Sequence, residues 1–180
     1  LHQIDDSPAP CRLTVTEDGA RWLSSLTIKA IDKRSLVINR APAAGQMEVV
    51  LVDSPNGPAL CATQFGGKGY FLRFTGKTSA IDTDPDQRLQ VAMVVDALEG
   101  VARRDASFLH DRKVAVVSLR NGPPTGGWSS TPVQSWLDAV KASRVLGDDD
   151  RFAVLTTPGQ VKAAMRNPDV YAAILNPYGE

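Results

Sequence analysis

Two short stretches of the sequence contain residue types that bind phosphate or metal ions. Gly76-Lys77-Thr78 has the lysine and hydroxyl of a phosphate-binding loop, but the first glycine of that motif would fall at Phe71. The stretch Asp82-Thr83-Asp84-Pro85-Asp86 begins like a calcium-binding loop, yet Gln87 and Met93 stand where that loop requires glycine and glutamate. The spacing argues against both motifs, and we interpret the acidic cluster as charge that is favoured at a helix start.

Histidine and cysteine, which supply most zinc ligands and many catalytic groups, are scarce. The chain has two histidines, His2 and His110, and two cysteines, Cys11 and Cys61. A zinc site is therefore not expected. His110 precedes an expected strand and would therefore lie at the amino end of that strand. Open α/β sheets bind ligands beyond the carboxyl ends of their strands, so we interpret His110 as a surface loop residue and not as a catalytic base. No Gly-x-Ser-x-Gly motif is present. We expect no metal and no cofactor, and the sequence identifies no catalytic residue.

The two cysteines leave two alternatives open. In an oxidising compartment, a Cys11–Cys61 disulfide would close a loop of about 50 residues and stabilise the fold by about 4 kcal/mol. In a reducing compartment, both would be small buried apolar side chains. Neither cysteine has a second cysteine or a histidine close by in sequence. We therefore expect a cytoplasmic protein with free thiols, and the alternative is a periplasmic or secreted domain stapled by the disulfide.

The positions of three loops predict where a ligand or partner would bind. The loops 75–82, 120–131 and 156–157 are expected to follow the carboxyl ends of parallel strands, where open α/β sheets bind their ligands. Each leads into a helix start with unpaired N–H groups and positive potential. Trp128 in the long middle loop would be a stacking platform or a binding anchor. The candidate binding residues are Lys77, Thr78, Asp82, Arg120, Asn121, Thr125, Gly126, Gly127, Trp128, Ser129, Ser130, Thr131, Thr156 and Thr157.

The helices that would position these loops begin with a repeated capping signal. It occurs at Asp84-Pro85-Asp86-Gln87, Thr131-Pro132-Val133-Gln134 and Thr157-Pro158-Gly159-Gln160. In each, the Asp or Thr oxygen accepts an early helical N–H, and the glutamine reaches back to the N–H of the cap. Proline suits the first helical position because its missing N–H would have no partner there. The signal predicts three helix starts.

The second half of the chain alternates short apolar strands with these helices. The predicted elements are strands at 70–74, 114–119 and 152–155, and helices at 85–103, at 132–146 and from residue 158 onward. Residues 170–175 fit a strand or a helix, because Ala172 and Ala173 favour a helix whereas Val170, Tyr171 and Ile174 favour a strand. Units of this kind are parallel and right-handed.

The first half shows the period of two that is typical of strands. The predicted strands are 11–16, 26–31, 36–39, 47–52 and 59–63, and the predicted turns are 17–19, 32–35, 53–58 and 66–69. The run 47–52 is typical of a central strand that is buried on both faces. The segment 26–31 also fits a helix, since Leu23, Leu26 and Ala30 share a helical stripe, but its β-branched residues favour a strand.

These elements predict an α+β fold with a mixed sheet. An N-terminal antiparallel β meander continues into β-α-β-α-β-α units, with the helices packed on the sheet. We expect residues 1–10 to be a leader or linker and residues 11–180 to form a single mixed α/β domain. The formal net charge of zero argues against nucleic acid as a partner. No apolar run approaches the ~20 residues of a membrane span.

Three functional hypotheses follow. The first is a non-catalytic binding or assembly module, which holds a protein partner or a small anionic ligand at the loops 75–82, 120–131 and 156–157. The second is a small hydrolase or transferase with an anion pocket at the same edge, in which Lys77 and Arg120 stabilise charge and Asp82 is the base. The third is an extracytoplasmic domain stapled by Cys11 and Cys61. We prefer the first, because no acid–base pair or nucleophile is recognisable in the sequence.

Overall fold

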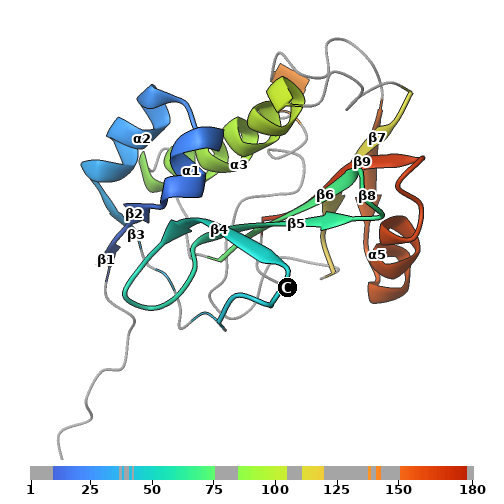
Figure 1. The fold of residues 1–180 in the computed structure, drawn as a ribbon, viewed down its shortest axis with the longest axis horizontal. Coiled ribbons are helices and arrows are strands. Elements are labelled where there is room, and N and C mark those ends of the chain that lie inside the picture. Colours follow the sequence, from blue (N-terminus) through green and yellow to red (C-terminus); the bar gives the residue numbers. More distant parts are fainter. Residues whose placement is uncertain are drawn as a thin grey trace, which may run out of the picture.

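The computed structural model describes residues 10–36, 38, 41, 43–75, 85–104, 111–119, 138, 141–142 and 151–177 of the 180-residue chain. A seven-stranded sheet joins the two halves (Figure 1). In spatial order its strands are β2 (Thr14–Val15), β4 (Glu48–Asp53), β5 (Leu60–Phe65), β6 (Gly69–Phe74), β9 (Tyr171–Asn176), β7 (Lys113–Val117) and β8 (Phe152–Leu155). The pairs from β2 to β6 are antiparallel and those from β6 to β8 are parallel. The predicted α+β class with a mixed sheet is therefore confirmed.

The last strand is inserted into the middle of the sheet. β9 pairs with β6 on one side and with β7 on the other. Its residues Ala172, Ala173, Ile174 and Leu175 are completely buried. A strand that is paired on both sides and covered on both faces consists mainly of apolar residues. This burial outweighs the helix propensity of the two alanines, and it decides between the two alternatives for 170–175.

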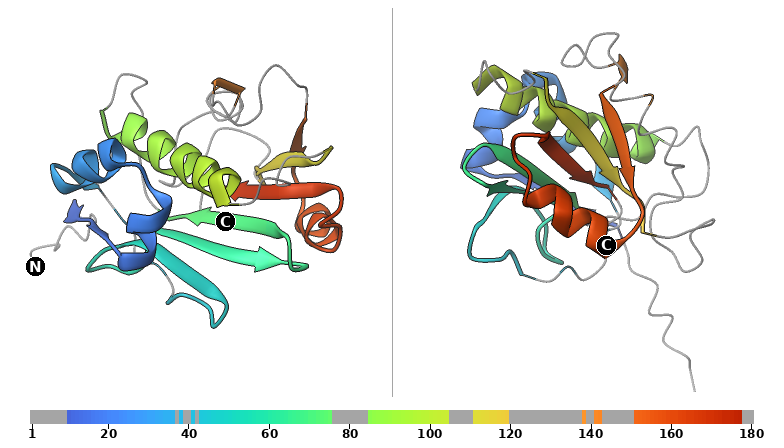
Figure 2. Two further views of the ribbon diagram at one scale, coloured as in Figure 1. Left: turned by 45° about the horizontal axis from the view of Figure 1, so that its top comes forward. Right: turned by 90° about the vertical axis from the view of Figure 1, so that its right-hand side faces the viewer.

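Helices pack on both faces of the sheet (Figures 1 and 2). On one face lie α1 (Glu17–Trp22), α2 (Ser25–Asp32) and α3 (Pro85–Arg104), and on the other lies α5 (Pro158–Met165). The core on the first face includes Leu60, Leu72 and Phe74 of the sheet with Met93 and Leu98 of α3. The core on the second face includes Phe65, Ala115, Val117, Leu155 and Ile174 with Ala164 of α5. No helix in the described ranges is both long and apolar enough to cross a membrane.

The predicted turn at 17–19 is the first turn of α1, so this prediction was wrong. Thr16 caps the helix, because its Oγ1 accepts a hydrogen bond from the Gly19 N–H at 3.0 Å. A Cβ atom added to Gly19 would stand 1.9 Å from the carbonyl oxygen of Leu51 in β4. Glycine at this position therefore permits a close approach of helix to strand and does not mark a turn.

The predicted strand at 26–31 is helix α2, so this prediction was also wrong. Ser24 caps α2 through a hydrogen bond from the Thr27 N–H to its Oγ, at 3.3 Å. Thr27 and Ile31 are both buried, and residues four apart share one face of a helix. Asp96 of α3 accepts the Ser24 N–H and fixes the start of α2. Capping and packing outweigh the strand preference of the β-branched residues.

Two further strand predictions in the first half need correction. The segment predicted as one strand at 11–16 forms two strands, β1 (Cys11–Arg12) and β2, which pair with different partners. β1 pairs with β3 (Ser35–Leu36) in a separate two-stranded sheet. The predicted loop 32–35 therefore connects a helix to a short strand. Of the predicted strand 36–39, Leu36 lies in β3, Ile38 is not in a strand, and residues 37 and 39 lie outside the described residues.

The strand predicted at 47–52 is β4, but it is not central and not buried on both faces. It lies second from the edge of the sheet, and Val49 is 40% exposed. The register shifts between Val50 and Val52, so Leu51 is an extra residue opposite β5. Such a bulge increases the local twist and bends the strand.

The remaining turns and helix starts agree with the sequence-based predictions wherever they are described. Gly66 and Gly67 both have positive φ in the β5–β6 hairpin, a conformation that glycine adopts at no steric cost. In the turn at 53–58, the Gly57 N–H donates to the Ser54 carbonyl oxygen at 3.0 Å. Helix α3 begins at Pro85 and α5 at Pro158, and strands β7 and β8 lie where predicted. Of the helix predicted at 132–146, residues 138, 141 and 142 are described and helical, and the rest lies outside the described residues.

Candidate functional site

The carboxyl ends of the parallel strands lie at one edge of the sheet, which we call the carboxyl edge. β6, β9, β7 and β8 all run in the same direction. Thr75 follows β6, Ser118 follows β7 and Thr156 follows β8. The three loops predicted to contain the site therefore leave from the same edge, as the capping signals led us to expect.

Only two of the candidate binding residues, Thr156 and Thr157, lie within the described residues. The others, which lie outside them, are Lys77, Thr78, Asp82, Arg120, Asn121, Thr125, Gly126, Gly127, Trp128, Ser129, Ser130 and Thr131. The hydrolase or transferase hypothesis depends on Lys77, Arg120 and Asp82, and all three lie outside the described residues.

Thr156 and Thr157 form the start of α5 at the carboxyl edge. Thr157 Oγ1 accepts the Gln160 N–H at 3.2 Å, and Gln160 Oε1 accepts the N–H groups of Thr157 at 3.2 Å and Thr156 at 2.7 Å. This is the capping box that the sequence predicts. The amide oxygen of Gln160 thus accepts the N–H groups of both threonines, and these hydrogen bonds hold the helix start in place.

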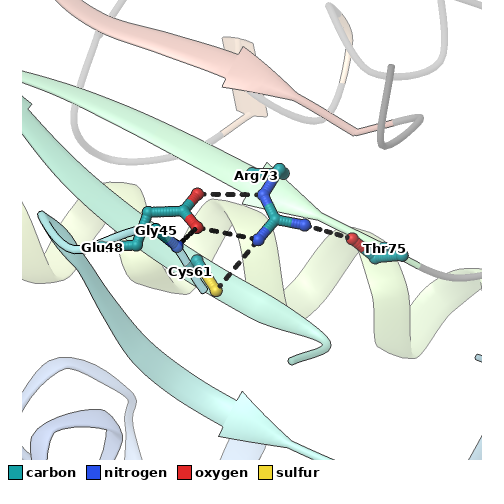
Figure 3. A network of polar contacts seen from close by, with 5 residues as sticks. All are labelled: Gly45, Glu48, Cys61, Arg73 and Thr75. Atoms are coloured by element: carbon teal, nitrogen blue, oxygen red, sulfur yellow. Dashed lines mark hydrogen bonds and ion pairs between the residues drawn. The ribbon is translucent and has the colours of Figure 1, made fainter. Parts of the chain in front are cut away.

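A polar network lies on the α5 face of the sheet, between the second and fourth strands (Figure 3). It consists of Gly45, Glu48 of β4, Cys61 of β5, Arg73 of β6 and Thr75, and we call it the Glu48–Arg73 network. Cys61 and Arg73 are paired across β5 and β6. Because their chain neighbours pack in the core beneath α3, the two side chains point to the opposite face.

Each nitrogen of the Arg73 guanidinium group has a partner (Figure 3). Nε donates to Glu48 Oε1 at 3.0 Å, and Nη2 donates to Glu48 Oε2 at 3.0 Å and lies 3.6 Å from Cys61 Sγ. Nη1 donates to Thr75 Oγ1 at 2.9 Å. The Gly45 N–H donates to Glu48 Oε2 at 2.8 Å. The ion pair is bidentate, which is the strong geometry for arginine and carboxylate.

Hydrogen bonding and burial together set the protonation states of the titratable groups in the network. The hydrogen bonds from Arg73 lower the pKa of Glu48, and those to Glu48 raise the pKa of Arg73. Burial raises the pKa of the Cys61 thiol to about 11. At neutral pH the carboxylate and guanidinium are therefore charged and the thiol is protonated. A general base needs a pKa near the working pH and a nucleophilic cysteine needs a thiolate, so these groups suit a structural role.

Sequence reasoning missed the Glu48–Arg73 network, although one signal was available. Arg73 interrupts an apolar strand at Tyr70-Phe71-Leu72-Arg73-Phe74, and arginine is buried in a sheet only when it is paired. Its neighbour across the parallel pair is Asn176, which is 1% exposed. A row of polar side chains thus runs beside the carboxyl edge, and its partners on other strands could not be assigned without the register.

A concave region lies at the other end of the strand order, beside β2. It has a volume of about 580 Å³ and is lined by Arg12, Leu13, Thr14, Val15, Ala20, Ile28 and Asp32. We call it the edge groove. Sequence reasoning missed it because its wall is made by α1 and α2, which were predicted as a turn and a strand.

A buried arginine joins the segments that precede the amino ends of the parallel strands, opposite the carboxyl edge. Arg112 is 5% exposed, and its Nη1 donates to the carbonyl oxygens of Lys68 and Pro168, each at 3.0 Å. Lys68 also forms an ion pair with Asp169. These contacts join the β5–β6 hairpin to the segment before β9. His110 lies outside the described residues, and Asp111 has a positive φ of 56°.

The structure contains no Cys11–Cys61 disulfide. Both thiols are free, Cys11 being half-buried and Cys61 buried. In the part of the chain that is described, no group of three or more histidine, cysteine, aspartate or glutamate side chains is arranged to hold a metal ion.

Neither the known protein families nor the solved structures include a match to this chain.

Proposed function

We propose that the protein is a non-catalytic binding or assembly module, which holds a protein partner or a small anionic ligand at the carboxyl edge. The observation that carries the proposal is the shared direction of β6, β7 and β8. Because of it, the loops 75–82, 120–131 and 156–157 leave from one edge. In open α/β sheets this is the edge where ligands bind.

The chemistry of the Glu48–Arg73 network favours binding over catalysis. The carboxylate and the guanidinium neutralise each other, and the pKa of Cys61 is raised to about 11. Such a network joins β4, β5 and β6 beside the carboxyl edge and offers no group that exchanges protons near pH 7. Binding residues are often found on loops that a scaffold of packed strands and helices positions.

Affinity capture tests this proposal. The wild-type chain and the double variant Arg120→Ala/Trp128→Ala would be immobilised and exposed to a lysate. Retained proteins and small molecules would be identified by mass spectrometry. Lys162→Ala, an exposed position on α5, is the matched control. We expect a set of binders that the wild type and the control retain and the double variant loses.

Two outcomes would overturn the proposal. One is retention of the same binders by the wild type and the double variant, with both shown to be folded by circular dichroism. The other is turnover of a captured small molecule by the wild type, which would favour the hydrolase or transferase hypothesis. In that case, Asp82→Asn should abolish the turnover.

We also propose a reducing compartment, the cytoplasm, as the location of the chain. The free thiols of Cys11 and Cys61 support this. Mass spectrometry of protein alkylated in its native cells should find both cysteines labelled, and a bridged pair would contradict the proposal.

A further inference from the structure

The edge groove is formed by side chains from elements that lie together at one end of the molecule (Figure 1). They are Arg12 of β1, Thr14 and Val15 of β2, Ala20 of α1, and Ile28 and Asp32 of α2. Leu13 also borders the groove but is buried and offers no surface. The volume of about 580 Å³ lies within the range of small-molecule sites, which is about 300 to 1,000 Å³.

The two charged residues lie toward the same end of the groove. Arg12 stands opposite Ser35 in the pair of β1 and β3. Asp32 ends α2 only three residues before Ser35. Between them, the Arg34 N–H donates to the Ile31 carbonyl oxygen at 3.2 Å in a tight turn. The pairing of β1 with β3 therefore places Arg12 beside the end of α2.

The rest of the groove is apolar. Ile28 lies one helical turn before Asp32, on the same face of α2. Val15 is the last residue of β2, and Ala20 belongs to α1, which begins two residues after Val15. Val15 and Ile28 are half-buried and pack against the core, so solvent reaches them only in part. The groove thus has a charged end and an apolar end.

The charges at the first end have no partner among the described residues. Neither Arg12 nor Asp32 forms an ion pair there, and they do not pair with each other. Asp32 is the last residue of α2, where the helix dipole disfavours a negative charge. An ammonium group bound beside Asp32 would offset this unfavourable interaction. A carboxylate is the complementary group for the guanidinium of Arg12, because the two can form paired hydrogen bonds.

We propose that the edge groove binds a free α-amino acid with a large apolar side chain. The ammonium group of the ligand faces Asp32, its carboxylate faces Arg12, and its side chain packs against Val15, Ala20 and Ile28. An α-amino acid has both charges beside one carbon atom and its apolar group beyond them, which is the order of the chemistry along the groove. A residue inside a peptide has neither charge, and each end of a peptide has only one of them.

Leucine and three matched compounds provide the probe. N-acetylleucine lacks the ammonium group, leucinamide lacks the carboxylate, and glycine lacks the apolar side chain. Each would be titrated into the wild-type full chain and followed by ¹⁵N–¹H NMR. We expect leucine to reach half-saturation at about 1 mM, with shifts at residues 12, 14, 15, 20, 28 and 32.

The expected differences between the compounds follow from the exposure of the charges. Because Arg12 and Asp32 are exposed, each ion pair contributes little, and N-acetylleucine and leucinamide should bind about two- to fivefold more weakly than leucine. Glycine should bind at least about tenfold more weakly, because it buries no apolar side chain.

Two variants assign each charge of the ligand to a residue. Arg12→Gln should weaken the binding of leucine about two- to fivefold but should not weaken that of leucinamide, which has no carboxylate to lose a partner. Asp32→Asn should likewise weaken the binding of leucine but not that of N-acetylleucine. Lys162→Gln, at an exposed position on α5, is the control and should change neither.

The contrary results are distinct. Absence of shifts with leucine up to about 20 mM, or shifts confined to residues outside the groove, would overturn the proposal. Equal binding of glycine, or equal binding of leucine and both blocked forms, would also overturn it. Tighter binding of leucinamide or N-acetylleucine than of leucine would overturn it as well, because the occupant would then be an end of a peptide. The comparison of ligands uses the wild type alone, so it stands even if a variant fails to fold.

Discussion

Replacing Glu48 by glutamine removes the charge that compensates the Arg73 guanidinium while keeping the size of the side chain. The side chains of Arg73 and Glu48 are only 13% and 17% exposed. Leaving one partner of a buried ion pair alone costs about 3 to 5 kcal/mol, and each hydrogen bond to a charged group contributes about 1.5 to 3 kcal/mol. Because the residual exposure lets water reach the guanidinium, we expect Glu48→Gln to lower the free energy of unfolding by about 2 to 3 kcal/mol.

The effect should depend on pH in a defined direction. The pKa of Glu48 is lower in the folded chain than its ordinary value of 4.5. Its contribution to stability is therefore fully present above that ordinary value and is lost as the pH falls through the lowered folded value. The difference between wild type and Glu48→Gln should be largest at neutral pH and should shrink as the pH is lowered below about 4.

Urea unfolding followed by far-ultraviolet circular dichroism, at pH values from 3 to 8, measures both quantities. Glu17→Gln is the matched control, because Glu17 is 91% exposed and its pair with Arg21 lies on the surface of α1. It should change stability by less than about 0.5 kcal/mol. The double variant Glu48→Gln/Arg73→Met should recover part of the loss, since no buried charge remains. A loss below 1 kcal/mol for Glu48→Gln, or a loss that is the same at pH 3 and pH 7, would refute this account of the Glu48–Arg73 network.

Three other predictions follow from described contacts. Thr157→Ala removes the cap of α5 and should cost about 1 kcal/mol in urea unfolding; an unchanged midpoint would show that the capping box contributes nothing. Gly19→Ala should lower the free energy of unfolding by about 3 kcal/mol, because the added Cβ would stand 1.9 Å from the carbonyl oxygen of Leu51. Gly159→Ala is the control and should be neutral, because the nearest atom to its Cβ would be 3.9 Å away. Equal stability of the two variants would contradict the close approach of α1 to β4. A maleimide should label half-buried Cys11 before Cys61, which is 1% exposed with a pKa raised to about 11, and equal rates by peptide mass spectrometry would contradict this order.

The second half of the fold was predictable because its signals are local. Thr157, Pro158 and Gln160 form a complete capping motif within four residues, and the structure contains that capping box. In the first half, the glycines of the hairpin at 66–67 are a similarly local signal, since both have positive φ. In each case the residues that determine the local structure lie next to one another in the sequence.

The errors in the first half arise from contacts that the sequence does not display. Gly19 was interpreted as a turn residue, but it is glycine because the Leu51 carbonyl lies against it. The segment 26–31 is helical because Ser24 caps it and Asp96 of α3 anchors that cap. Leu51 is 32 residues from Gly19 along the chain, and Asp96 is 72 residues from Ser24. The spacing of apolar residues cannot reveal contacts at such separations.

The sequence predicted at which edge of the sheet the candidate site lies, but it did not predict the contacts between side chains near that edge. The alternation of strands and helices indicated that three loops would leave the same side of the sheet, and the parallel pairs agree. The Glu48–Arg73 network depends on the registers of β4, β5 and β6, in which Cys61 stands opposite Arg73. Register is set by the hydrophobic pattern and by turn geometry, and the alternation of apolar residues alone did not show which residues of β4, β5 and β6 stand opposite each other.

Hydrogen exchange of the full chain, measured alone and with the binder identified by affinity capture, tests the central proposal most directly. The account predicts slower exchange in peptides that cover residues 73–82, 118–131 and 155–160, which include or directly follow the ends of β6, β7 and β8 and contain the proposed binding residues. Slower exchange confined to residues 66–69, 111–113 and 167–170, at the opposite ends of the parallel strands, would contradict it.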